Sequence, residues 1–121
     1  MGSKILIIDD DEDILETMGS LLKYQGFEIL SAATVGKGIA MIEEKSPDLV
    51  LLDIMFPEKK TRGFDAATEI KQKHPHIPII VFTAINREYA FDFNKEDIQA
   101  DEFLNKPVDM DMLVKLIKKY V

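Results

Sequence analysis

Short apolar segments recur along the chain, and within each segment the apolar residues occupy consecutive positions. Strands covered on both faces have this pattern, whereas a strand with one face in water alternates apolar and polar residues. The segments therefore predict five strands of a parallel sheet. They lie at 5–8, 27–30, 49–52, 79–82 and, more weakly, 103–104.

Between these segments, apolar residues recur at helical spacing. The first helical pattern follows an acidic turn at 11–13, whose charges suit a helix N-terminus, and it ends at Gly26. The last pattern has Asp109 as its predicted N-cap. Five helices are predicted, with apolar positions spread over 14–22, 35–42, 64–70, 89–93 and 113–120.

Strand and helix thus alternate five times, which predicts right-handed crossovers and an open parallel sheet between two layers of helices. The fold class is α/β, doubly wound. No linker, repeat or low-complexity segment interrupts the pattern, so we expect one domain over residues 1–121.

Composition narrows the class of protein. Of the 121 residues, 46% are hydrophobic and 31% charged, which is typical of a folded domain in water. The net charge of −7 argues against nucleic acid as a direct partner. No apolar run approaches the roughly 20 residues of a membrane span, and no signal peptide is present, so we expect a cytoplasmic protein without a membrane partner.

The absence of cysteine excludes disulfides and thiolate metal sites. Any metal ion would then be a hard cation held by oxygen ligands, such as magnesium or calcium.

Candidate chemistry collects where the predicted strands end. In an open parallel sheet, functional groups lie just outside the carboxyl ends of the strands. The first strand runs into Asp9 and Asp10, the third into Asp53, the fourth into Thr83, and the fifth reaches Lys106. No charged residue follows the second strand, as expected of an outer strand. Three carboxylates, a hydroxyl and an ammonium group are therefore expected at one edge of the sheet.

Three neighbouring carboxylates repel one another, at a cost on the order of a few kcal/mol for each close pair. Together with Lys106 their formal charge is −2, which one divalent cation would neutralise. Oxygen ligands with room for water suit Mg²⁺, which works beside phosphoryl oxygens. Carboxylate, magnesium, lysine and hydroxyl are together the groups needed for phosphoryl transfer onto an aspartate.

Each of these residues also has an ordinary structural interpretation. An aspartate after a strand is more often a helix N-cap than a ligand. Here Asp11 can be the N-cap, which leaves Asp9 and Asp10 available as ligands. Thr83 alone would be a β-branched strand residue, and Lys106 alone a surface charge. Their common position at one end of the strands is what favours a site.

Four segments carry a resemblance to a known family. ILIIDDDEDI at 5–14, DLVLLDIMFP at 48–57, IIVFTA at 79–84 and ADEFLNKP at 100–107 together resemble the receiver domain of two-component response regulators. The resemblance covers essentially the whole chain in the same order. It implies a flavodoxin-like sheet with the strand order 2-1-3-4-5 and five helices.

The resemblance also implies a role for each acidic residue. Asp53 would be the phosphoryl acceptor. Asp10 would bind Mg²⁺ directly, Asp9 directly or through water, and the main-chain carbonyl of Met55 would be a further ligand.

The remaining motif residues would contact or sense the phosphoryl group. Lys106 would contact a phosphoryl oxygen, and Thr83 would move to donate a hydrogen bond to the group, helped by the main-chain N–H of Ala84. Phe103 would be the aromatic switch that follows Thr83 inward. An ordinary core aromatic is an equally good interpretation of Phe103.

The implied function is a signalling phosphoacceptor rather than an enzyme. Asp53 would take the phosphoryl group from a phosphohistidine on a sensor histidine kinase or phosphotransfer protein, and the domain would then present an altered face to a downstream protein target. Dimerisation through the last two helices is left open. The sequence names neither the kinase nor the target.

Two departures from the family pattern change the expectations. A two-residue insertion lengthens the loop at 58–62, which is either a solvated loop or a basic lip that contacts a partner. Met55 and Ile85 occupy the two positions that, in the family, flank the path of the hydrolytic water. Both residues are apolar in this chain. We therefore expect slow loss of the phosphoryl group, with a half-life that Met55→Ala and Ile85→Ala would shorten.

Rival interpretations belong to other classes of protein. The nearest is a receiver-like interaction module that is not phosphorylated, which the presence of Asp53, Thr83 and Lys106 disfavours. A magnesium-dependent phosphatase with an aspartyl nucleophile would commonly carry a second aspartate at position 55, where this chain has Met55. A flavin-binding domain is disfavoured because the loop after the first strand is acidic.

Overall fold

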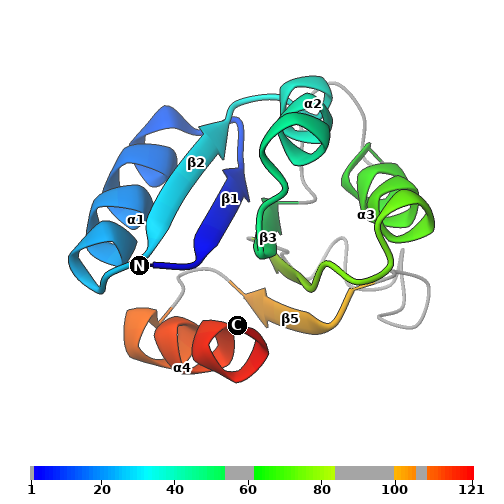
Figure 1. Cartoon of the computed structure of the whole chain (residues 1–121). Coiled ribbons are helices and arrows are strands. Elements are labelled where there is room, and N and C mark those ends of the chain that lie inside the picture. The colour runs from blue at the N-terminus through cyan, green and yellow to red at the C-terminus, as the bar shows by residue number, and fades with distance from the viewer. Residues whose placement is uncertain (1, 54–61, 84–99, 106–108) are drawn as a thin grey trace.

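Five parallel strands form one sheet in the order β2-β1-β3-β4-β5, which confirms the predicted topology (Figure 1). The computed structural model describes residues 2–53, 62–83, 100–105 and 109–121. β2 lies at one edge of the sheet, as the lack of charge after it suggested. The strands are β1 (Lys4–Ile8), β2 (Glu28–Ala32), β3 (Leu49–Asp53), β4 (Ile79–Thr83) and β5 (Glu102–Asn105).

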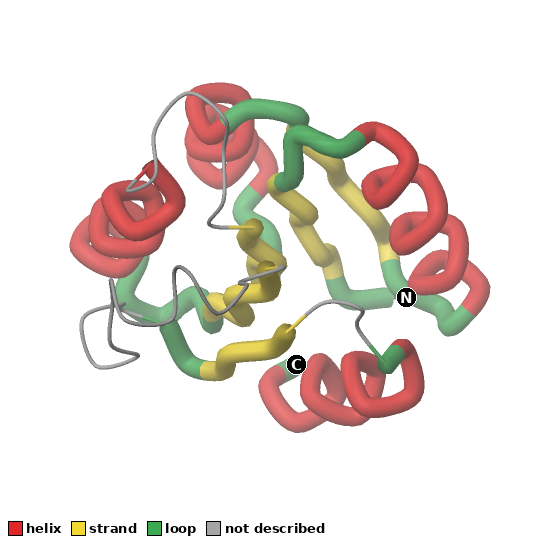
Figure 2. The backbone as a smooth tube through the Cα atoms, turned by 180° about the vertical axis from the view of Figure 1, so that it is seen from behind, coloured by secondary structure: helices red, strands yellow, loops and turns green. Residues whose placement is uncertain are grey.

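Helices cover both faces of this sheet (Figure 2). The apolar side chains of α1 and α4 pack on one face, and those of α2 and α3 pack on the other. The described helices are α1 (Glu12–Tyr24), α2 (Val35–Lys45), α3 (Arg62–Lys73) and α4 (Met110–Tyr120). The helix predicted around Tyr89 and Phe93 lies outside the described residues.

The strands in the middle of the sheet are buried on both faces. Every residue at 5–8 and at 49–52 is fully inaccessible to solvent. This burial explains why their apolar residues are consecutive in the sequence. The edge strand β2 is more exposed, and it begins one residue later than predicted, after the half-buried Phe27.

The helix ends follow the predicted capping residues. Asp11 is the N-cap of α1, where its carboxylate accepts hydrogen bonds from the main-chain N–H groups of Asp13 and Ile14. Asp109 caps α4 in the same way. After α1, Gly26 adopts a φ of 98°, a left-handed conformation that glycine takes without strain.

No helix in the described part of the chain combines the length and the apolar character that crossing a lipid bilayer would need.

Two glycines of α2 have opposite surroundings. A Cβ atom on Gly38 would lie 2.8 Å from Cγ1 of Ile8 and would also collide with Cδ1 of that side chain. A Cβ atom on Gly36 would meet no atom within 4 Å. Close approach of α2 to β1 therefore depends on the missing side chain at position 38.

We predict that Gly38→Val lowers the free energy of unfolding by about 2 kcal/mol, because the added methyl groups overpack the buried Ile8. The matched variant Gly36→Val should change it by no more than about 0.5 kcal/mol. Urea unfolding of both variants measures the difference. Equal effects of the two substitutions would contradict the close approach of α2 to β1.

Candidate functional site

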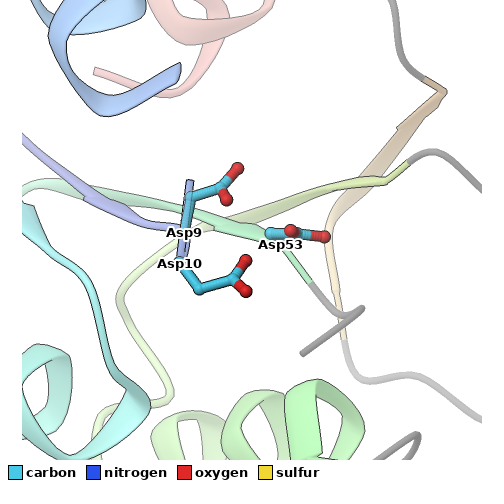
Figure 3. Close-up of side chains that lie close together, drawn as sticks. All are labelled: Asp9, Asp10 and Asp53. Carbon is cyan, nitrogen blue, oxygen red and sulfur yellow. The ribbon is translucent and has the colours of Figure 1, made fainter. Parts of the chain in front are cut away.

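Three carboxylates meet at the carboxyl edge of the sheet (Figure 3). Asp9 and Asp10 directly follow β1, and Asp53 is the last residue of the neighbouring strand β3. One carboxylate oxygen from each lies within 4.8 Å of the others. Asp9 is fully buried and Asp53 is 3% exposed, whereas Asp10 is exposed to solvent. The sequence prediction that these three residues converge is confirmed.

The acidic residues after β1 have two different structural roles. Asp11 caps α1, as predicted, and this leaves Asp9 and Asp10 to face Asp53. The main-chain N–H of Asp9 donates to the carbonyl oxygen of Ala32 at 3.1 Å, so the contact between β1 and β2 continues one residue beyond β1. The backbone at Asp9 is therefore fixed by the sheet.

The sequence analysis did not predict one hydrogen bond at this turn. The main-chain N–H of Asp11 donates to Oδ1 of Asp9 at 2.9 Å. An aspartate that accepts a hydrogen bond from the N–H two residues later forms an Asx turn. The spacing of Asp9 and Asp11 could have indicated this turn, which orients the buried carboxylate before any ligand binds.

The charges at this edge require compensation. At 4.8 Å and an effective dielectric constant of 20, two carboxylates repel each other by about 3.5 kcal/mol. All the converging ligand atoms are oxygens, two of the three residues are buried, and the exposed Asp10 leaves one side open to water. Such a donor set fits a hard divalent cation that keeps part of its hydration shell, which is the preference of Mg²⁺.

Two further predicted site residues lie on the next strands. Thr83 is the last residue of β4 and follows Phe82, which pairs with Asp53 across the sheet. Thr83 itself is paired with Asn105, the residue that precedes Lys106 in the sequence. Backbone pairing thus brings the end of β4 to the same edge as the acidic cluster.

Phe103 occupies the middle of β5, paired with Val81. Its ring is half-buried and packs against the core between the sheet and the helices α2 and α3. Both interpretations of Phe103, as a switch and as a core aromatic, are compatible with this position.

The other predicted site residues lie outside the part of the chain that the structure describes. They are Met55, Ala84, Ile85, Lys106 and residues 58–61 of the loop predicted at 58–62. Arg62, the last residue of that predicted loop, is instead the first residue of α3.

Comparison with known proteins shows to which family the chain belongs. A model of the response regulator receiver domain matches residues 5–118. The chain belongs to the response regulator receiver family. It is also 35% identical over 116 residues to the transcriptional regulatory protein CpxR of Klebsiella pneumoniae subsp. pneumoniae (strain HS11286). That match covers 96% of this chain and 48% of CpxR, so the chain spans about half the length of this curated relative.

Solved structures of receiver domains have the same fold. A CheY-like receiver domain protein from Methanospirillum hungatei JF-1 superposes with a TM-score of 0.85 at 31% identity, over 98% of this chain and 93% of that one. The response regulator TrrA of Thermotoga maritima, solved in complex with Mg²⁺-BeF, has a TM-score of 0.83 at 31% identity, over 98% and 99% of the two chains.

Membership in this family establishes the general kind of function. Receiver domains of response regulators are signalling domains that switch through phosphorylation, and as a family they interact with histidine kinases and downstream effectors. The acidic cluster of this receiver domain is its candidate site for that chemistry.

We predict that Asp53→Asn raises the free energy of unfolding in magnesium-free buffer by about 1–2 kcal/mol, because it removes one of three mutually repelling charges. The wild-type domain should gain thermal stability when Mg²⁺ is added, and Asp53→Asn should gain much less.

Asp13→Asn is a matched control, since Asp13 is an exposed acid in the first turn of α1 and does not belong to the cluster. It should leave the response to Mg²⁺ unchanged. A magnesium-free Asp53→Asn domain that is less stable than wild type would contradict the repulsion. Thermal melts with and without the ion make both comparisons.

Proposed function

We propose that this receiver domain accepts a phosphoryl group on Asp53 from the phosphohistidine of a sensor histidine kinase or phosphotransfer protein. The observation that carries the proposal is the convergence of Asp9, Asp10 and Asp53 at the carboxyl edge of the sheet. Asp53 ends the central strand β3 and is almost completely buried, so its carboxylate is held in one place.

In the proposed reaction, a carboxylate oxygen of Asp53 attacks phosphorus in line with the bond to the imidazole nitrogen. The phosphorus–nitrogen bond breaks as the acyl phosphate forms, and the departing imidazole takes up a proton. The Asx turn at Asp9 and the strand end at Asp53 hold the carboxylates in position before the donor arrives. Such preorganisation lowers the barrier because little rearrangement is left for the reaction itself.

Mg²⁺ is the proposed cofactor, held by Asp9, Asp10, Asp53 and the main-chain carbonyl of Met55. When bound, the ion would neutralise charge on the phosphoryl oxygens. The donor set of the acidic cluster fits it, and the similar protein TrrA was solved with Mg²⁺-BeF.

The residues on the last two strands complete the proposed site. Lys106 would offset charge on a phosphoryl oxygen, because it follows β5 at the edge where Thr83 ends β4. Thr83 and the N–H of Ala84 would donate hydrogen bonds to the new dianion. Phe103 would then move with Thr83 and alter the surface around β5, where a downstream protein would bind.

The fate of the phosphoryl group is part of the proposal. We keep the prediction that apolar Met55 and Ile85 slow its hydrolysis, since they would give an attacking water little polar guidance. The proposed location is the cytoplasm.

We predict that the wild-type domain, incubated with acetyl phosphate and Mg²⁺, gains the mass of one phosphoryl group. Asp53→Asn should gain none. Asp10→Asn should react at least about a hundredfold more slowly, because it loses several kcal/mol of charge stabilisation. Intact-mass spectrometry over time measures all three.

Asp111→Asn is the control, since Asp111 is an exposed acid in the first turn of α4, outside the acidic cluster. It should react at the wild-type rate. If the wild-type domain takes up no phosphoryl group from acetyl phosphate and does not bind beryllofluoride with Mg²⁺, then the alternative, an interaction module that is not phosphorylated, is correct.

A further inference from the structure

The central strands of the sheet lack a hydrophobic pattern that could set their register. In β1 and β3, residues 5–8 and 49–52 are all branched aliphatic and all fully buried. Register is strongly specified when one face of a strand is apolar and the other polar, because a slip of one residue exchanges the two faces. In β1 and β3 such a slip would merely exchange one aliphatic side chain for another.

The candidate site nevertheless requires one particular register. Asp9 and Asp53 meet because Ile8 pairs with Leu52. A slip of one residue would displace Asp53 along the strand by about 3.3 Å and turn its side chain to the opposite face of the sheet. The three ligand atoms could then no longer lie within 4.8 Å of one another.

Polar contacts at the opposite, amino edge of the sheet can set the register that the apolar residues leave unspecified. Asp48, just before β3, lies beside Lys4, the first residue of β1. The main-chain N–H of Lys4 donates to Oδ2 of Asp48 at 2.8 Å, and the main-chain N–H of Asp48 donates to the carbonyl oxygen of Lys4 at 2.8 Å. These two bonds form a clamp that fits a single alignment of β1 with β3.

The same two-bond clamp recurs between β4 and β5. The main-chain N–H of Ile79, which begins β4, donates to Oδ2 of Asp101 at 2.8 Å. The N–H of Asp101 donates back to the carbonyl oxygen of Ile79 at 2.8 Å. The two clamps are alike in bonds, in distances and in position just before a strand.

The β4–β5 clamp has additional support from α3. Nζ of Lys71 lies 2.7 Å from Oδ2 of Asp101, and it also donates a hydrogen bond to the carbonyl oxygen of Ile77 at 2.8 Å. The side chain of Lys71 is only 17% exposed, so solvent screens this ion pair weakly. The clamp at Asp101 therefore holds a helix as well as two strands.

Each clamp residue lies five positions before a residue of the proposed site. Asp48 precedes Asp53 by five residues, and Asp101 precedes Lys106 by five. Five residues of extended chain span about 16 Å. The register fixed at the amino edge is thus transmitted along each strand to the carboxyl edge.

We propose that Asp48 and Asp101 are positioning residues that set the register of the β1–β3 and β4–β5 pairs, and through it the geometry of the phosphorylation site. This inference rests on the proposed function. The clamp at Asp48 aligns the magnesium ligands, whereas the clamp at Asp101 aligns Thr83 with Asn105, the residue before Lys106 in the sequence. Loss of each clamp should therefore impair a different step.

Two alanine variants separate these steps. Asp48→Ala should weaken Mg²⁺ binding, measured by calorimetry, by about tenfold, the change in affinity that corresponds to one lost hydrogen bond. Asp101→Ala should bind Mg²⁺ with wild-type affinity and should accept phosphate from acetyl phosphate more slowly at saturating Mg²⁺. Asp48→Asn should restore most of the affinity, because the amide oxygen can still accept the bond from Lys4.

Ile42→Val serves as the control for stability. Ile42 is a buried core residue of α2, so its truncation destabilises the domain without touching either clamp. If Asp48→Ala remains folded and binds Mg²⁺ as wild type does, or if Ile42→Val weakens binding equally, the positioning role of Asp48 is wrong. Equal phosphorylation rates for Asp101→Ala and wild type would refute that of Asp101.

Amide hydrogen exchange and cross-strand nuclear Overhauser contacts give a readout independent of the ligand. Asp48→Ala should accelerate exchange in β3 and produce contacts of a second β1–β3 register, and Ile42→Val should not. A single native register in Asp48→Ala overturns the inference even if the wild-type domain never binds Mg²⁺. Failure of the wild type to bind Mg²⁺ or accept phosphate would instead overturn the proposed function.

Discussion

Mutual repulsion of three carboxylates is the main physical constraint on the candidate site of this domain. Asp9 and Asp53 are buried, and with Asp10 they offer ligand atoms within 4.8 Å of one another. Burial of Asp9 and Asp53 removes the water that would screen this pair, so their mutual repulsion opposes folding by a few kcal/mol. The sheet and the Asx turn hold the backbone of these residues in place, and a bound divalent cation would offset the repulsion.

The two edges of the sheet have different roles: the clamps lie at the amino edge, and the acidic cluster lies at the carboxyl edge. Strands buried on both faces make a stable frame, but their uniform apolar sequences carry little information about alignment. The clamps at Asp48 and Asp101 provide that information with main-chain hydrogen bonds at the amino edge. Stability and alignment are thus supplied by different residues, which is why the site can be precise although its strands are chemically repetitive.

Much of this arrangement could be predicted from the sequence, because its signals are local. Consecutive apolar residues predicted the strands, and Asp11 and Asp109 were correctly predicted as helix caps. Convergence of Asp9 with Asp53 followed from the rule that functional groups collect at the carboxyl ends of parallel strands. The clamps could not be predicted in this way, since Asp48 and Lys4 are 44 residues apart and an aspartate before a strand does not identify its partner.

The proposed function depends on the binding of one divalent cation by the acidic cluster. Calorimetric titration of the purified wild-type domain with MgCl₂ tests it most directly. We predict saturable binding of one ion per chain, which Asp9→Asn weakens and which high monovalent salt does not abolish. A titration that never saturates, or binding unchanged by substitution of Asp9, would contradict it.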